Sequence, residues 1–372
     1  NYWWELYYSG LYNVQTWNTN LWTTTGYQLF HQGLVEPLAA GIDRVASRVG
    51  QREQQIYADV ALRTFTENLR GTGRTLQHVW WLWRNDPRAE HIPIFHRTGT
   101  AMRRDVAESV GAWERSPHDW MRRAAPWITA TSRGLESGDV AMRERVFDAR
   151  MRALAEHASR QELGRLDEDW MRDWQQTQVR EQTDVFGQVL DYSKELTFHA
   201  PMSQIGELLI KKPREMPYGL GFLWRTLFPF AQTPDNLIRR GLELLPLNPV
   251  IVGSWYFKPE TMKWAGWLPY PGREAFTPEA SMMFAKQMIG TMMAAAVWLA
   301  WSQGKVTGPA PDDPDEREAM FRRGELPNSV RVGDTWVSWR RFEPISLPLS
   351  IALSAFGAME RLEAQQLRRN EV

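Results

Sequence analysis

Few residues in this chain have the types and spacing that catalysis or metal binding needs. His91 and His96 flank an Ile-Pro-Ile-Phe segment, but no third ligand lies nearby, and a structural zinc ion takes four ligands. Asp312, Asp313 and Asp315 could hold a divalent cation, although capping of a following helix explains the same residues. We therefore predict no metal site and no cofactor.

The sequence patterns of common enzyme classes are also missing. There is no P-loop, no Gly-x-Gly-x-x-Gly, no Gly-x-Ser-x-Gly and no His-Glu-x-x-His pattern. The pair Glu108-Ser109 resembles the Glu-Ser pair of lytic transglycosylases, but the Gly-Leu-Met-Gln element that should follow it is missing. Cysteine is absent, which excludes disulfides, thiolate metal sites and a cysteine nucleophile. We predict that the protein is not an enzyme.

Paired arginines are the remaining groups with a chemical use. Such pairs can hold the phosphates of a nucleic acid, although solvated helix ends and salt bridges explain them equally simply. The formal net charge is zero over 372 residues, so no overall field attracts DNA and any contact needs a local patch. The candidate DNA-facing residues are Arg239, Arg240, Arg322, Arg323, Arg340 and Arg341.

Ser281–Trp301 is the most apolar segment, and Lys286 is its only formal charge. As a helix it would be roughly 31 Å long, close to the thickness of a bilayer core. Lys286 and Gln287 shorten its uninterrupted apolar part to Met288–Trp301, which is the length of a buried core helix. A membrane-competent helix and the central helix of a soluble core both remain open. The predicted membrane or oligomer contacts are Met288, Gly290, Met292, Ala294, Val297, Trp298 and Trp301.

The pattern of the whole chain predicts a mainly α protein. We expect an elongated multi-helix bundle or tube with long charged helices, one apolar helix and one small β-hairpin. Composition divides the chain into four consecutive regions. These are an aromatic-rich helical region (1–99), long charged helices (100–196), a region rich in proline and aromatic residues (197–276), and a final region with the apolar helix, the hairpin and a C-terminal helix (277–372).

Local signals place several element boundaries. Asp313-Pro314-Asp315-Glu316 fits a capping box at a helix start. Ser329–Trp339 alternates around a Gly-Asp pair and predicts the hairpin. Gly134–Gly138 is predicted to break a helix, and Pro348 to interrupt the apolar stretch Ile345–Met359. The spacing of Trp170 and Trp174 predicts that their rings stack one turn apart.

Three segments in the second half resemble one protein family. Leu227–Asn236 is similar to a Phe-Pro-Phe…Thr-Pro-x-Asn element of the large internal virion proteins, or ejection proteins, of tailed phages. Gly304–Gly308, followed by Asp313-Pro314, is similar to that family's Gly-Lys-Ile-Thr-Gly…Asp-Pro loop. Arg331–Trp339 resembles its Ile-Gly-Asp hairpin. The resemblance covers less than half of the chain.

The resemblance implies a protein that is stored in the virion and leaves through the tail. Such proteins assemble in the host periplasm and inner membrane into a conduit for DNA. The partners implied are further copies of the chain in a ring or tube, other virion or ejection proteins, double-stranded DNA passing without sequence specificity, and the host inner membrane. The alternative is a soluble scaffolding or anchoring module of a giant internal virion protein, in which the apolar helix never meets lipid.

Overall fold

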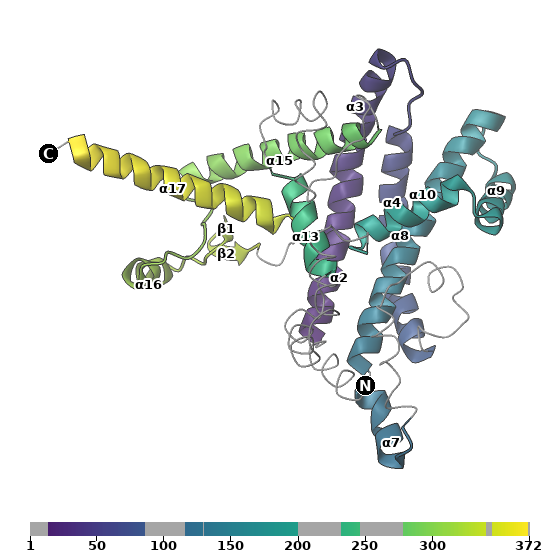
Figure 1. The fold of residues 1–372 in the computed structure, drawn as a ribbon, viewed down its shortest axis with the longest axis horizontal. Helices are drawn as coiled ribbons and strands as arrows, with labels where there is room; N and C mark the ends of the chain where they lie inside the picture. Colours follow the sequence, from purple (N-terminus) through teal and green to yellow (C-terminus); the bar gives the residue numbers. More distant parts are fainter. Residues whose placement is uncertain are drawn as a thin grey trace, which may run out of the picture. The chain divides into compact units, whose positions relative to one another are not determined.

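The computed structural model describes residues 14–85, 116–128, 130–199, 232–245, 278–339 and 344–370. Helices hold 77% of the described residues and the described sheet has two strands, which confirms the mainly α class with one small hairpin. The chain forms two compact units, one of residues 1–33 with 59–200 and one of residues 34–58 with 201–372. Each unit therefore joins segments that are distant in the sequence (Figure 1).

The first unit is built around α8, which contacts α2, α7, α9 and α10. A π-helical turn, His31–Val35, follows α2 at the boundary between the units. The helices of this unit are α2 (Val14–Phe30), α4 (Ala58–Asn85), α7 (Asp119–Ile128), α8 (Ala130–Leu163), α9 (Glu168–Glu181) and α10 (Asp184–Leu196).

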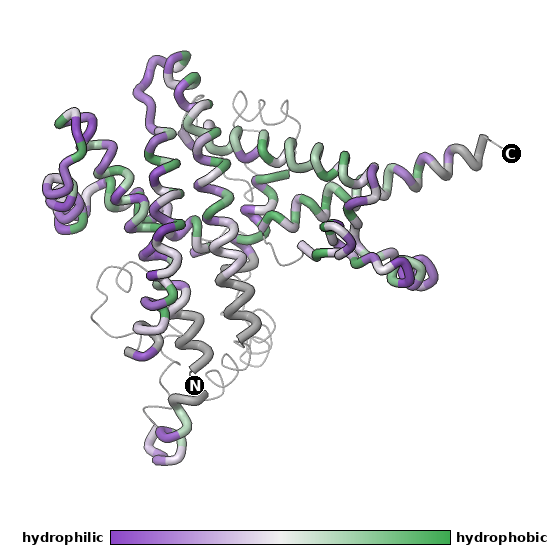
Figure 2. The backbone as a smooth tube through the Cα atoms, turned by 180° about the vertical axis from the view of Figure 1, so that it is seen from behind, coloured by the Kyte–Doolittle hydropathy of each residue, from purple (hydrophilic) through white to green (hydrophobic). Residues whose placement is uncertain are grey.

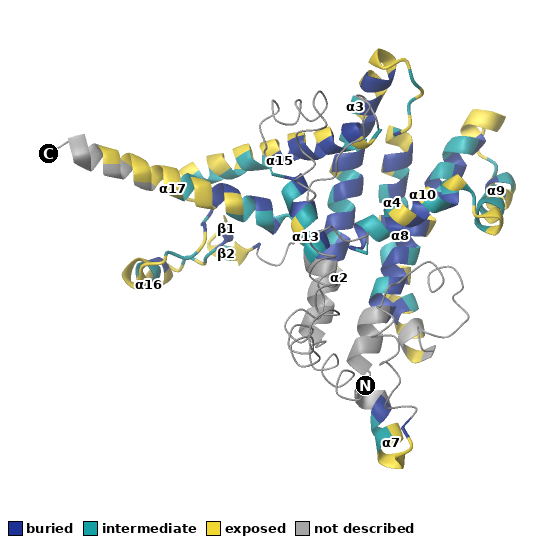
Figure 3. Cartoon of the chain, viewed as in Figure 1, coloured by how far each residue is buried: buried dark blue, intermediate teal, exposed yellow. Residues whose placement is uncertain are grey.

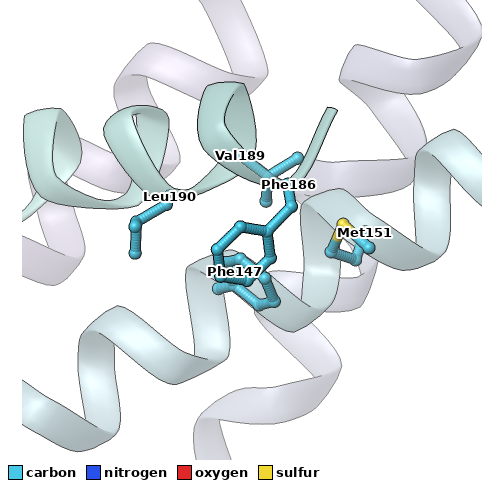
Figure 4. Close-up of a cluster of buried hydrophobic side chains, with 5 residues drawn as sticks. All are labelled: Phe147, Met151, Phe186, Val189 and Leu190. Atoms are coloured by element: carbon cyan, nitrogen blue, oxygen red, sulfur yellow. The ribbon is translucent and has the colours of Figure 1, made fainter. Parts of the chain in front are cut away.

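An apolar cluster joins α8 to α10. Phe147 and Met151 from α8 pack against Phe186, Val189 and Leu190 from α10, and all five side chains are buried (Figure 4). The spacing of three and four residues in α10 places its members on one side of that helix. The rings of Phe147 and Phe186 lie edge to face with centroids 5.6 Å apart, an arrangement that adds about 0.5–1.5 kcal/mol to the burial of their area.

Polar contacts hold α4 in the same unit. Arg63 lies 2.6 Å from the Glu156 carboxylate of α8, and the buried amide of Asn68 donates to Gln32 over 2.7 Å. Such contacts are the expected way to pack helices whose apolar surface is small, since buried polar groups must find partners.

Two local predictions in this unit have opposite outcomes. Trp170 and Trp174 stack with centroids 6.5 Å apart, as predicted. The predicted break at Gly134–Gly138 is wrong, because α8 runs through it without interruption. A glycine costs a helix only about 1 kcal/mol, and the burial of Val140, Ala141 and neighbouring residues outweighs that cost.

The second unit contains the apolar helix and the hairpin. Its elements are α3 (Glu36–Val49), α13 (Gln232–Glu243), α15 (Pro278–Ser302), α16 (Pro314–Arg322), β1 (Ser329–Val332), β2 (Thr335–Ser338) and α17 (Ser346–Asn370). Helix α15 contacts α3, α13 and α17, so it is the element that joins the others.

The predicted hairpin and helix cap in this unit are both confirmed. Strands β1 and β2 pair antiparallel with Val332 opposite Thr335, which leaves Gly333-Asp334 as a two-residue turn. Gly333 has φ of +62°, a value that such turns require and that glycine adopts without strain. The Asp313 side chain accepts from the Asp315 backbone N–H over 2.8 Å and caps α16.

The predicted interruption at Pro348 is wrong. Pro348 is the third residue of α17, in the first turn, where backbone N–H groups have no partner within the helix. The apolar stretch and the predicted C-terminal solvated helix therefore form one continuous element, Ser346–Asn370.

Candidate functional site

Burial changes abruptly along α15. Most residues from Ala280 to Gly290 are buried, whereas none from Thr291 to Ser302 is (Figure 3). We call these two parts the buried half and the exposed half of α15. The helix is apolar on all sides along most of its length (Figure 2), so the difference comes from what surrounds it and not from its own pattern.

The buried half contains the only cation of the helix, and a carboxylate neutralises it. Lys286 is 4% exposed, and its ammonium lies 2.7 Å from a Glu243 oxygen at the end of α13. Glu243 also accepts from Arg240 over 2.8 and 3.0 Å, one bond to each carboxylate oxygen. The Gln287 side chain donates to the Glu243 backbone carbonyl over 2.7 Å. This cluster satisfies charges that would otherwise be costly to bury.

Gly290 allows α13 and α15 to approach at the end of the buried half. A Cβ atom built on Gly290 would lie 1.9 Å from the Leu244 backbone oxygen, a distance that no side chain tolerates. Only glycine permits this contact, and the contact marks the boundary between the two halves of the helix.

Asp43 of α3 fixes the first turn of α15. Its carboxylate accepts from the Gln55 and Ile56 backbone N–H groups over 2.9 and 3.0 Å, and from Ser281 over 3.3 Å. Burial alone would raise the pKa of Asp43, but the hydrogen bonds, together with the charge of Arg52, hold that pKa below its usual value. The buried half of α15 is thus tied to both α3 and α13.

The exposed half contacts α17 along one side. Trp298 and Phe356 lie edge to face at 4.9 Å, and the Trp301 indole donates to Glu360 over 2.9 Å. Val297 and Trp301 also pack against the cluster of Val306, Trp339 and Leu353. At 100° per residue, Met292 and Leu299 lie on the side of α15 away from Val297.

Several large apolar side chains remain exposed on these two helices. On α15, Met292 and Leu299 are each 59% exposed, and on α17, Met359 and Leu362 are 54% and 59% exposed. Soluble monomers rarely expose large contiguous apolar patches, so such surfaces usually contact a partner or a membrane. We call the exposed large apolar residues of the two helices from Met288 onward the apolar surface: Met288, Met292, Trp298, Leu299, Ile351, Met359 and Leu362.

By length and composition, α15 is long and apolar enough to cross a membrane, and among the residues described no other helix is. Only 33% of the most apolar 18-residue stretch of α15 is buried. A core helix of a soluble protein passes the same test of composition but is mostly buried.

The structure separates the predicted contact residues into three groups. Met288, Met292 and Trp298 are exposed, whereas Ala294, Val297 and Trp301 are partly buried. Gly290 is buried against Leu244, the residue that follows α13, and so differs from the other predicted contact residues.

The candidate DNA-facing arginines also differ from one another. Arg240 is 4% exposed and bound to Glu243, so its guanidinium cannot reach a phosphate and that prediction is corrected. Arg239 lies 3.8 Å from the same carboxylate. Arg322 and Arg323 are exposed and pair with Glu318 and Glu325. Arg340 and Arg341 lie outside the described residues, as do His91, His96 and Glu108-Ser109.

A group of titratable residues on α8 was not identified from the sequence. Glu144 lies 3.0 Å from His78 in a cavity of about 390 Å³ between α4 and α8. Burial and, to a lesser degree, the charge of Asp148 raise the pKa of Glu144 to about 7, while the charge of Arg143 opposes the shift. The sequence carries no signal of this, because acids and bases alternate along all of α8. No set of three or more potential metal ligands occurs in the described parts of the chain.

The comparisons with known proteins identify no relative. No protein-family model, no curated protein and no solved structure matches the chain.

We predict that Glu243→Gln lowers the free energy of unfolding by about 3–5 kcal/mol, because it removes a buried negative charge that is hydrogen-bonded to the buried cations of Arg240 and Lys286. Glu318→Gln removes an exposed partner of Arg322 and should cost less than about 1 kcal/mol. Urea unfolding followed by circular dichroism measures both values. Equal losses in the two variants would contradict the proposed role of Glu243.

We predict that Gly290→Ala destabilises the protein by about 1–3 kcal/mol or more, because its methyl group collides with the Leu244 carbonyl. Gly357→Ala in α17 meets no atom within 4 Å and should be neutral or slightly stabilising, since alanine favours helix. Thermal unfolding of the two variants compares them directly. A melting temperature of Gly290→Ala at or above that of the unmodified chain would show that α13 does not contact α15 in this way.

Glu144 should make stability depend on pH. In the folded state the Glu144 carboxyl keeps its proton up to about pH 7, whereas in the unfolded chain it releases the proton near pH 4.3. As the pH rises through that window, ionisation of Glu144 therefore lowers the free energy of unfolding. Glu144→Gln should therefore raise the free energy of unfolding by about 1–3 kcal/mol at pH 8 and leave it unchanged at pH 4. Urea titrations at the two pH values, with exposed Glu181→Gln as the control, test the sign; a loss of stability at pH 8 would refute it.

Proposed function

We propose that the protein is a noncatalytic ejection protein of a tailed phage and forms part of an oligomeric conduit for DNA across the host cell envelope. The observation that carries this proposal is the division of α15 into a buried half and an exposed half. The resemblance of three segments to internal virion proteins supports the choice of phage.

The buried half would act as the anchor. Its contacts with Glu243, Asp43 and Leu244 tie α15 to polar helices that remain in water. The exposed half would then enter lipid, or pack against a neighbouring copy, without disrupting the core. Burial of a leucine or methionine side chain contributes about 1.5–3 kcal/mol, so the apolar surface supplies a substantial driving force.

The role proposed for DNA is electrostatic and independent of sequence. Arg322 and Arg323 are exposed on or directly after α16 and could contact phosphates in a ring of copies. Their intramolecular carboxylate partners, Glu318 and Glu325, neutralise both arginines, which suits passage of DNA better than tight binding.

The alternative is a soluble scaffolding or anchoring module inside a giant virion protein. The burial of Lys286 and the first half of α15 favours it, since that half belongs to an ordinary protein core. In this alternative, the apolar surface is covered by another protein segment and never by lipid.

Flotation with phosphatidylcholine vesicles tests the proposal. We expect the unmodified chain to float at high salt, and Met292→Asp/Leu299→Asp to stay in the dense fraction, because charges in the bilayer core are costly. Both positions are exposed, so the folded monomer should tolerate the change. Leu326→Asp/Val332→Asp places the same charges on exposed apolar positions outside α15 and should float normally.

The oligomeric state distinguishes the two functions. Multi-angle light scattering with the vesicles should show a defined oligomer that requires the apolar surface. If the unmodified chain does not float, and Met292→Asp/Leu299→Asp only dissociates a soluble oligomer, the membrane conduit is refuted and the scaffolding module is supported.

A further inference from the structure

Helix α4 carries a second apolar ridge, in the other unit. Leu62, Leu69 and Leu76 are 51%, 43% and 51% exposed. They are seven residues apart, and an α-helix drifts only about 20° over seven residues, so the three side chains follow one line along the helix.

The other side of α4 faces the interior of its unit. Val60, Thr64, Asn68, Thr75 and Val79 are buried there. Val79 packs with Val140 and Ala141 of α8, and Asn68 is bonded to Gln32. The leucine ridge is therefore the outer side of a helix whose inner side is already occupied.

One indole extends the ridge at the C-terminal end of α4. Trp80 lies about 40° around the helix from Leu76 and is 61% exposed, whereas Trp81 lies about 140° from Leu76, beside His78. Indole rings favour the boundary between water and lipid, where the ring lies in an apolar region and the N–H finds a polar partner.

From Leu69 onward the charges beside the ridge have one sign, whereas near Leu62 the carboxylate of Asp59 lies 2.8 Å from His157. The segment Asn68–Asn85 contains Arg70, Arg74 and Arg84 and no aspartate or glutamate. The preceding acid, Glu67, is 9% exposed and already lies 3.2 Å from Arg63 and 3.0 Å from Arg70. A partner of this surface must therefore be apolar at its centre and anionic at its margin.

A bilayer with anionic headgroups meets both conditions. A second helix would need apolar positions three or four residues after each of the first two leucines to form a coiled-coil seam. Thr66, Thr72 and Gly73 occupy three of these positions, and the fourth, Phe65, lies against Gly33. DNA would use the arginines but gives no role to three exposed leucines. Leucine and tryptophan on one side, with arginine beside them, is the composition of a helix that lies in the membrane interface.

We propose that α4 is an interfacial membrane helix, which lays Leu62, Leu69, Leu76 and Trp80 on an anionic lipid surface while its arginines bind the headgroups. This goes beyond the proposed function, because the surface lies in the unit without α15 and requires no helix to cross the bilayer. It would recruit the protein to a membrane through lipid charge, whereas the entry of α15 depends on apolarity alone.

The test uses the full chain carrying Met292→Asp/Leu299→Asp, in which the apolar surface of α15 is disabled. We expect this protein to bind vesicles of phosphatidylcholine with phosphatidylglycerol at low salt, and to bind pure phosphatidylcholine vesicles at least tenfold more weakly. Leu69→Gln/Leu76→Gln should weaken the binding roughly tenfold. Arg70→Gln/Arg84→Gln should weaken it at least tenfold, since each arginine contributes about a factor of five at an anionic surface.

Matched controls exist in the same unit. Leu163→Gln/Leu166→Gln changes two leucines that are 42% and 51% exposed, and Arg172→Gln/Arg180→Gln changes two exposed arginines; neither should alter binding.

Equal effects of test and control variants would overturn the proposal. A loss of oligomer mass in Leu69→Gln/Leu76→Gln with unchanged lipid binding would overturn it in favour of a helical partner. The unmodified chain could float with vesicles at high salt while the variant with a disabled α15 binds no vesicles at all. That result would refute the role of α4 and leave the proposed function standing.

Discussion

The buried carboxylate of Glu243 is the interaction on which the arrangement of the second unit depends. Lys286 is the only cation in a largely apolar helix, and a charged amine cannot be buried without a counter-charge. Glu243 supplies it and binds Arg240 as well, which fixes α13 against α15. The contact of Gly290 with Leu244 then ends the interface, and beyond it α15 packs against α17 and against the cluster of Val306 and Trp339.

This arrangement explains how one helix can serve two environments. Its buried half follows the rules of a soluble core, with satisfied polar groups and close packing. Its exposed half presents large apolar side chains next to the edge-to-face pair of Trp298 and Phe356. In the account proposed for this protein, the first half anchors and the second half binds lipid or a neighbour, while α4 offers a separate, charge-dependent contact.

Much of the fold could be predicted from local patterns, because those patterns act within a few residues. The Asp313 cap, the Gly333-Asp334 turn and the extent of α15 follow from such signals. The errors at Gly134–Gly138 and Pro348 arose where tertiary burial or position in the first turn outweighed a local preference. The partner of Lys286 could not be predicted, since Glu243 lies 43 residues away and nothing in either segment indicates the pairing. The same holds for the burial of Arg240 and Gly290.

The most direct test places an environment-sensitive NBD fluorophore on single cysteines, which the cysteine-free sequence permits without further changes. The labelled positions are Met292→Cys and Leu299→Cys on the exposed half of α15, with Val332→Cys on the hairpin as the control. On addition of phosphatidylcholine vesicles, the account predicts blue-shifted, brighter emission at positions 292 and 299 and no change at 332. Unchanged emission at 292 and 299 while the protein floats with the vesicles would contradict the claim that this half of the helix enters lipid.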